Sequence, residues 1–376
     1  MRNELYRFHT SRRLALADAM SVRPKLQVHG SRMKLPSRNV PTPDVSFSIA
    51  LLLRGPFALS LLILLSCTPS IEAGRGGQPS PCPFNACKIR EGDEVWLVST
   101  RHLGERGDQC SYDCPDFEFF RLRRNCPDWE PATSADFFAS DNPDVLTTVV
   151  VHGNRMTSEW VNDRGYKMYC DFVAHTDRPI RHVIWSWPSA PIPQTRAIVL
   201  DAQVKAERTP IQSFYLGCFL SRIQPDVNVG ILGYSFGSRV IIGAMHALGG
   251  GTIANRQLPN CGDPVVKPRV VLWAAACDAC GIAPGGIYDR TLSAITAGLV
   301  MVNQTDPVLR RYDRLIPDTN SQALGFVGVP CCNLGECACR LRQIDVTDEI
   351  SRRHQWVRYF ESACVMNNTR RYVLWQ

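Results

Sequence analysis

Short, continuous apolar runs alternate with amphipathic stretches over most of the chain, from Glu94 onward. A short apolar run between turn residues indicates a strand buried on both faces, and such strands alternating with helices are typical of a parallel sheet. The pattern predicts an α/β fold, with a mostly parallel sheet of the eight-stranded type and helices on both of its faces. The expected strands are 94–99, 118–123, 144–153, 180–187, 227–232, 269–275, 298–303 and 343–347.

Amphipathic stretches between these runs predict the helices. Thr157 or Ser158 can cap one of them, because a hydroxyl side chain accepts a hydrogen bond from the first helical turn. Pro210 interrupts the longest one. The expected helices are 157–174, 195–223, 238–248, 288–297 and 357–364.

The most informative motif is Gly233-Tyr234-Ser235-Phe236-Gly237, which joins the expected strand 227–232 to the expected helix 238–248. As five residues alone the pattern is weak, but a strand before it and a helix after it make it specific. The glycines permit a sharp turn that raises the serine hydroxyl above the sheet. This strand-turn-helix unit is similar to the nucleophile elbow of α/β-hydrolases.

Three further motifs carry the same resemblance. The chain resembles α/β-hydrolases, and among them uncharacterised bacterial lipase- and esterase-like members, from about Glu91 to Phe360. The resemblance implies a serine hydrolase with a nucleophile, an acid and a histidine in that chain order, acting on a small-molecule or lipid-like ester without a metal or an organic cofactor. The motifs are His152-Gly153-Asn154, Ser186-Trp187-Pro188-Ser189 and the segment from Asn303 through Asp306 to Leu309.

The resemblance assigns three catalytic residues by their order. Ser235 is the expected nucleophile, and Asp306, directly after the strand 298–303, is the expected acid. Asp278, after the preceding strand, is the alternative acid. Only His246 and His354 follow Ser235 in the chain. His246 lies inside the expected helix, so His354, after the last strand, is the expected base.

An oxyanion hole requires backbone N–H groups directed at the developing negative charge. The N–H of Phe236, the residue after the nucleophile, is one candidate, and the N–H of Asn154, in the turn after His152-Gly153, is the other. His152 is expected to position this turn. The Cys-rich stretch 320–340 lies between the acid and the base in the chain and could fold as a flap beside them.

Charge is unevenly distributed. The whole chain carries a formal charge of +7, and residues 1–54 account for it with ten Lys or Arg against three Asp or Glu. The remainder is neutral and offers no long-range attraction to a polyanion, which disfavours nucleic acid as a partner. An apolar run at 57–65 follows the basic segment and predicts a signal peptide within residues 1–73, with Met33 as an alternative start. Two kinds of processing are expected: cleavage of the signal peptide after Ala73, or lipidation of Cys67, which would anchor the protein to a membrane.

Sixteen cysteines support export, because disulfides persist in oxidising compartments. We expect a Cys-rich extension over 74–143, a catalytic domain over 144–376 with the Cys-rich insertion 320–340, and disulfides within the clusters. Cys170 and Cys218 are interpreted as buried apolar residues instead. Two other hypotheses stay open: a non-catalytic binding protein of the same fold, and a metal or redox protein that uses the Cys277/Cys280 pair.

Overall fold

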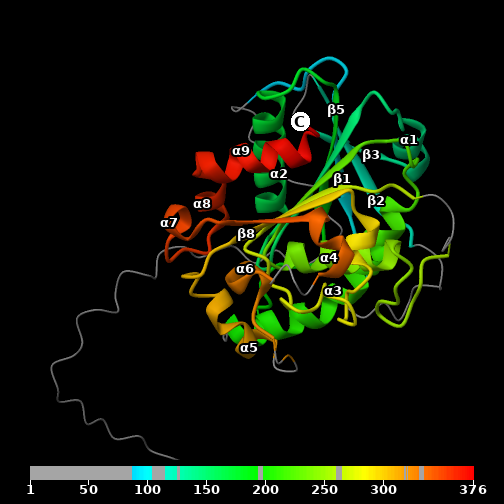
Figure 1. Cartoon of the computed structure of the whole chain (residues 1–376). Helices are drawn as coiled ribbons and strands as arrows, with labels where there is room; N and C mark the ends of the chain where they lie inside the picture. Colours follow the sequence, from blue (N-terminus) through cyan, green and yellow to red (C-terminus); the bar gives the residue numbers. More distant parts are fainter. Residues whose placement is uncertain are drawn as a thin grey trace, which may run out of the picture. The chain divides into compact units, whose positions relative to one another are not determined.

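The computed structural model describes residues 87–103, 115–124, 128–193, 198–259, 265–316, 319, 321–329 and 334–376 (Figure 1). These residues belong to one compact unit, Glu72–Gln376. The predicted signal peptide, Met33 and Cys67 lie outside the described residues. Within the described ranges, no helix has both the length and the apolar character needed to cross a bilayer.

A sheet of nine strands forms the centre of this unit, in the order β3-β2-β1-β5-β4-β6-β7-β8-β9. Every pairing is parallel except those of β2 with β1 and β3. This confirms the predicted α/β class and all eight expected strands, and adds the edge strand β3. The strands are β1 (Glu94–Ser99), β2 (Glu118–Leu122), β3 (Trp129–Ala132), β4 (Leu146–Val151), β5 (Ile180–Ser186), β6 (Val229–Tyr234), β7 (Arg269–Trp273), β8 (Ala297–Val302) and β9 (Leu341–Asp345).

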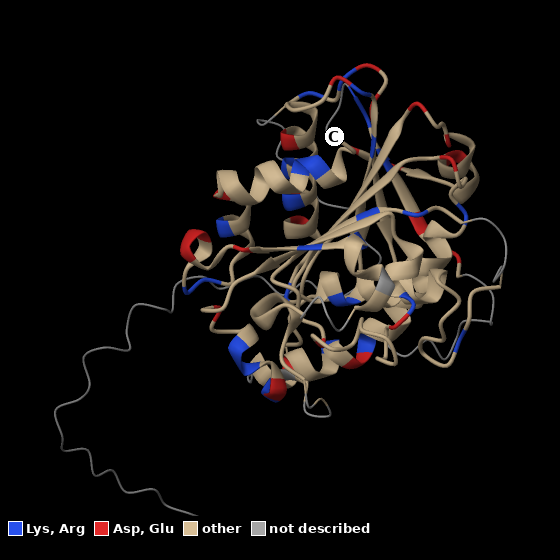
Figure 2. Cartoon of the chain, viewed as in Figure 1, with Lys and Arg blue, Asp and Glu red and all other residues tan. Residues whose placement is uncertain are grey.

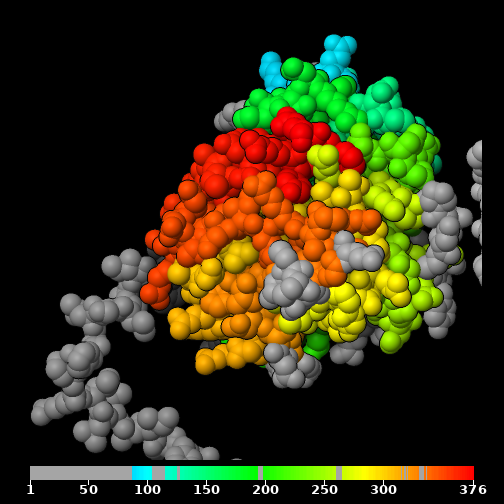
Figure 3. Space-filling model, in the orientation of Figure 1, coloured from blue at the N-terminus to red at the C-terminus, as the bar shows by residue number. Residues whose placement is uncertain are grey.

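Helices cover both faces of the sheet, as predicted. The helices α2 (Ser158–Val173) and α9 (Ala363–Val373) pack on one face, and α3 (Ile198–Leu220) and α4 (Phe236–Leu248) pack on the other (Figure 1). An ion pair between Arg370 and Asp171 joins α9 to α2, and the space-filling view shows the C-terminal segment in red beside green chain (Figure 3). Shorter helices complete the fold: α1 (Ser134–Ala139), α5 (Tyr312–Leu315), α6 (Leu324–Val327), α7 (Thr347–Ile350), α8 (Trp356–Glu361), and the 3₁₀ helices η1 (Thr291–Ala294), η2 (Leu309–Arg311) and η4 (Gly335–Arg340).

Three helix predictions were wrong in detail. Pro210 does not interrupt the long expected helix 195–223, since α3 continues through it from Ile198 to Leu220. The expected helix 288–297 is only the single 3₁₀ turn η1, because Ala297 already begins β8. The expected helix 357–364 divides at Ser362, whose hydroxyl accepts a hydrogen bond from the Val365 N–H and so begins α9. A capping side chain at that position favours a new helix start over continuation.

The topology brings distant segments to one edge. In a parallel sheet the carboxyl ends of the strands meet on the same side, where loops can build a site. The residues that follow β4, β6 and β8 there are His152, Ser235 and Asn303. The core beneath this edge includes Trp185 and Trp187, both fully buried.

A disulfide joins Cys87, ahead of β1, to Cys170 on α2. This corrects the interpretation of Cys170 as a core thiol, because its side chain reaches the N-terminal segment across 83 residues of sequence. Cys218 is fully buried on α3, as predicted.

Removing this disulfide should destabilise the protein substantially. In the chain-entropy model, closing a loop of this length lowers the free energy of the folded state relative to the unfolded one by about 4.5 kcal/mol, with a usual range of about 2–5. We expect the Cys87→Ser/Cys170→Ser protein to lose that much in the free energy of unfolding, measured by urea denaturation. Cys280→Ser, which removes an exposed cysteine, is the control and should change little. Equal stability of the two variants would contradict the prediction.

A buried histidine on β5 should make stability depend on pH. Burial lowers the pKa of His182 to about 4, while its ring nitrogens lie 2.8 Å from Thr148 Oγ1 and 2.9 Å from the Gly165 carbonyl. An unfolded histidine has a pKa of about 6.5, so the unfolded state binds more protons between pH 6.5 and 4. Stability therefore falls as the pH falls through this window, by about 3 kcal/mol for this group.

The His182→Gln variant isolates this contribution, because its amide keeps hydrogen-bonding capacity and does not titrate. We expect its free energy of unfolding to fall less steeply than that of the wild type between pH 6.5 and 4. Parallel curves for the two proteins would show that His182 is not the titrating group.

Candidate active site

Ser235 lies at the turn between β6 and α4 in a backbone conformation that side-chain-bearing residues seldom adopt, with φ 55° and ψ −119°. Close packing explains the two flanking glycines. A Cβ on Gly237 would lie 2.2 Å from the Val151 carbonyl oxygen, and one on Gly233 would lie 2.5 Å from Ile241 Cδ1. Only glycine fits at both positions, and the strained turn directs Ser235 out from the sheet edge.

Ser235, His354 and Asp306 form a chain of hydrogen bonds. Ser235 Oγ is 3.1 Å from His354 Nε2, and His354 Nδ1 is 2.7 Å from Asp306 Oδ2. The other oxygen of Asp306 accepts the N–H groups of Val308 and Leu309, at 2.9 and 3.0 Å. Asp306 is fully buried, whereas the His354 side chain is 17% exposed, so the imidazole remains within reach of a small molecule.

Two residues that the sequence analysis gave no role fix the loop of His354. Asn303 Nδ2 donates to the carbonyls of Ser351 and Arg353, at 2.8 and 3.2 Å. The Tyr234 hydroxyl donates to the carbonyl of His354 itself. Tyr234 is partly buried, and burial raises the pKa of its phenol. Asn303 was visible in the quoted motif, but its partners lie about fifty residues away.

The alternative acid and the other histidine lie elsewhere. Asp278 accepts hydrogen bonds from the Tyr312 hydroxyl (2.8 Å) and Thr319 Oγ1 (3.0 Å) and makes no hydrogen bond with His354. His246, on α4, accepts the N–H of Arg290 at 3.3 Å. The structure thus brings Ser235, Asp306 and His354 together and leaves Asp278 outside the group.

The two expected oxyanion donors flank Ser235. Phe236 is the first residue of α4, where N–H groups lack an intrahelical partner. Asn154 follows Gly153, where a Cβ would lie 3.1 Å from Ser235 Cβ. The Asn154 side chain donates a hydrogen bond to Asp201 at 3.0 Å. Among the described residues, the backbone N–H groups of Asn154 and Phe236 donate to no other group.

His152 holds the turn that carries Asn154. Its Nε2 accepts a hydrogen bond from the backbone N–H of Trp187 at 3.1 Å. Its Nδ1 therefore carries the proton and donates to the Gly153 carbonyl at 2.9 Å. Burial lowers the pKa of His152 well below its usual value, and the nearby Arg101 cation lowers it further. A neutral ring with both nitrogens engaged positions the turn, as predicted.

No metal centre is formed by the residues that the structure describes, because no three His, Cys, Asp or Glu side chains gather there. Cys277 is buried, and burial raises the pKa of its thiol, whereas Cys280 is exposed. The insertion 320–340 is described only in part, as α6 and η4 with neighbouring residues.

Comparison with known proteins adds little. No protein-family model and no curated protein matches the chain. The chain is similar to a solved structure, the product of the gene lin2722 from Listeria innocua, at 12% identity over 61% of this chain and 94% of that one. The TM-score is 0.29, too low to support an argument about either molecule.

Proposed function

We propose that the protein is a serine hydrolase of the α/β-hydrolase type that cleaves a carboxylic ester through Ser235, His354 and Asp306. The observation that carries the proposal is the hydrogen-bond chain from Ser235 Oγ through His354 to Asp306, placed at a strained strand-to-helix turn. A serine without a catalytic role would need neither the strained turn nor the hydrogen-bonded partners His354 and Asp306.

Nucleophilic attack follows from this geometry. Asp306 accepts the Nδ1 proton of His354, which leaves Nε2 free to take the proton of Ser235. The serine oxygen then attacks the ester carbonyl, and the N–H groups of Phe236 and Asn154 stabilise the oxyanion. His354 passes the proton to the leaving alkoxide, and an acyl-enzyme remains.

Water completes the reaction. His354 removes a proton from a water molecule, the resulting hydroxide attacks the acyl-enzyme, and the proton returns to Ser235 as the acid leaves. Each step uses the same three side chains and the same two N–H groups. No step requires a cofactor.

Export is part of the proposal. The Cys87–Cys170 disulfide supports an oxidising compartment, since such bonds are rare in the cytosol. A signal peptide within residues 1–73 and anchoring through Cys67 are the routes that the sequence suggests.

Labelling with a fluorophosphonate probe tests the proposal, because the probe reacts only with an activated serine. We expect the purified protein to be labelled and the Ser235→Ala and His354→Ala variants to be unlabelled. Ser293→Ala, which removes an exposed serine on η1, is the control and should label like the wild type. A folded wild type that resists labelling would refute the hydrolase and favour a non-catalytic binding protein of the same fold.

A further inference from the structure

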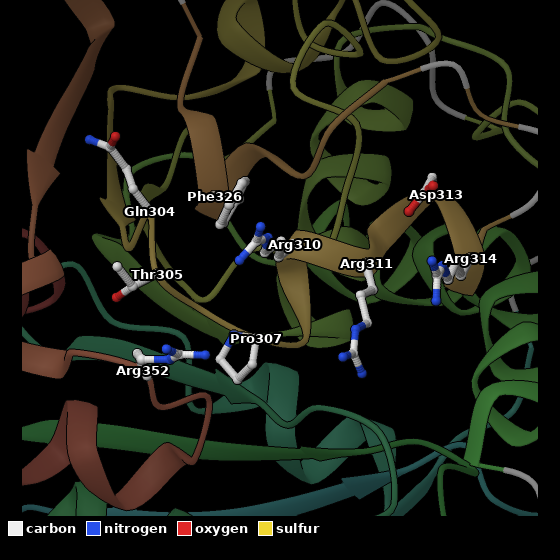
Figure 4. A pocket seen from close by; sticks show the side chains of 9 residues that line it. All are labelled: Gln304, Thr305, Pro307, Arg310, Arg311, Asp313, Arg314, Phe326 and Arg352. Atoms are coloured by element: carbon white, nitrogen blue, oxygen red, sulfur yellow. The ribbon is translucent and has the colours of Figure 1, made fainter.

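A cavity of about 750 Å³ lies beside the loops that carry Asp306 and His354. Thr305 and Pro307 in its wall flank Asp306, and Arg352 precedes His354 by two residues. Two residues span at most about 7 Å, so the backbone at Arg352 is close to that at His354. The lining residues, shown in Figure 4, are Gln304, Thr305, Pro307, Arg310, Arg311, Asp313, Arg314, Phe326 and Arg352.

The cavity is strongly cationic. Four arginines line it against one carboxylate, Asp313, and three of them belong to the η2–α5 segment, where Figure 2 also shows basic positions. Arg352 comes from a different loop, the one before α8 (Figure 4). We name this feature the arginine cavity.

These four arginines are exposed, and their side chains line one space. In the part of the chain that the structure describes, none of the four makes an ion pair or a side-chain hydrogen bond. Several half-exposed arginines elsewhere do pair with a carboxylate: Arg121 with Glu94, Arg123 with Glu130, and Arg358 with Glu361. Four unpaired cations around one space repel one another, and an anion between them would relieve that repulsion.

The arginine cavity has a fixed support. Buried Tyr312, between the arginines of η2 and α5, donates its hydroxyl to Asp278 at 2.8 Å and accepts from Arg239 at 2.6 Å. The Arg310 N–H donates to the Asp306 carbonyl at 3.0 Å, which ties this segment to the active-site loop. Phe326 and Pro307 add apolar surface that suits a carbon chain.

We propose that the arginine cavity binds an anionic group, a carboxylate or a phosphate, on the ester that Ser235 cleaves. The inference rests on the proposed hydrolase function and names its substrate class: esters with a negative charge several bonds from the scissile carbonyl. Pairing with two exposed arginines should raise kcat/KM about tenfold, which corresponds to about 1.4 kcal/mol.

Matched ester pairs test the substrate class. One series is the mono-p-nitrophenyl esters of glutaric, adipic and suberic acids, and its neutral counterparts carry a methyl ester at the far carboxyl. A second series carries the carboxylate on the alcohol side, and a third a phosphate monoester. We expect kcat/KM to be about tenfold higher for the anionic member of at least one series, and this preference to shrink in 0.5 M salt.

Variants locate the effect. Arg310→Gln/Arg352→Gln removes one cation from each side of the arginine cavity, and we expect it to bring the ratio of anionic to neutral kcat/KM close to one. Arg290→Gln removes an arginine that is 62% exposed outside the cavity and should leave that ratio unchanged. An unchanged ratio in the double variant would overturn the proposal.

The outcomes separate this inference from the hydrolase proposal. If the protein is labelled and hydrolyses neutral esters without any preference for anionic ones, only the inference about the arginine cavity is overturned. Failure of labelling overturns the hydrolase proposal, and a binding measurement then tests whether the arginine cavity takes an anion. Calorimetry with adipate and with phenyl phosphate on Ser235→Ala protein should give binding at low salt. Adding Arg310→Gln/Arg352→Gln should weaken that binding about tenfold. Absence of such binding overturns the inference without any measurement of turnover.

Discussion

Replacing Asp306 with asparagine is expected to lower kcat for ester hydrolysis by about 10⁴-fold. The carboxylate accepts the Nδ1 proton of His354 at 2.7 Å and so leaves Nε2 free to receive the serine proton. An asparagine that turns its NH₂ group to Nδ1 makes that nitrogen the acceptor, so His354 carries its proton on Nε2 and cannot act as a base. Steady-state kinetics on a p-nitrophenyl ester measure the loss, and KM should change much less than kcat.

Asp278→Asn is the matched control, because it makes the same change at the other candidate acid. Asp278 contacts Tyr312 and Thr319 rather than His354, so we expect kcat to stay within about threefold of the wild type. Thermal unfolding of both variants shows whether either has lost its fold. A large loss in Asp278→Asn with little loss in Asp306→Asn would transfer the acid role to Asp278.

The central strands of the sheet were predictable because they are buried on both faces. Strands such as β8, with five buried residues in succession, read as unbroken apolar runs whatever their neighbours are. The edge strand β3 was not predictable in this way, since it has four residues and includes Pro131. The helix α1 was also missed, although Thr133 and Asp136 form a capping box that marks its start.

The residues of the candidate site also differ in whether the sequence could predict them. Ser235 follows from a local motif, and Asp306 and His354 follow from the chain order that the resemblance implies. Their catalytic roles stay predictions, although the structure brings the three side chains together. The supports of the site, Asn303 and Tyr234, were not predictable, because each acts on a loop that only the folded sheet brings near.

Contacts between distant segments also decided what the cysteines and arginines do. The partner of Cys170 is 83 residues away, and its own helix gave no sign of it. The arginine cavity combines the segment after β8 with a loop after β9, and each contributes cations that read singly as surface residues. Local pattern therefore predicts elements and single motifs well, and predicts poorly which loops meet.

Gly237→Ala should produce the largest effect of any single methyl group in the site. The added Cβ would lie 2.2 Å from the Val151 carbonyl oxygen and 2.7 Å from that of His152, both backbone atoms that cannot move aside cheaply. We expect the free energy of unfolding to fall by about 3 kcal/mol. Because α4 must shift to relieve the contact, the N–H of Phe236 also moves, and loss of one oxyanion donor lowers kcat by about 10²-fold.

Gly217→Ala supplies the control, as it adds the same methyl group to a buried glycine of α3. Its Cβ would meet neighbours no closer than 3.5 Å, an ordinary contact, and alanine favours a helix interior by about 0.5–1 kcal/mol. Urea unfolding should therefore find Gly217→Ala as stable as the wild type or more so, with kcat unchanged. If Gly237→Ala matched it in both measurements, the close contact between α4 and the end of β4 would not be what fixes the turn at Ser235.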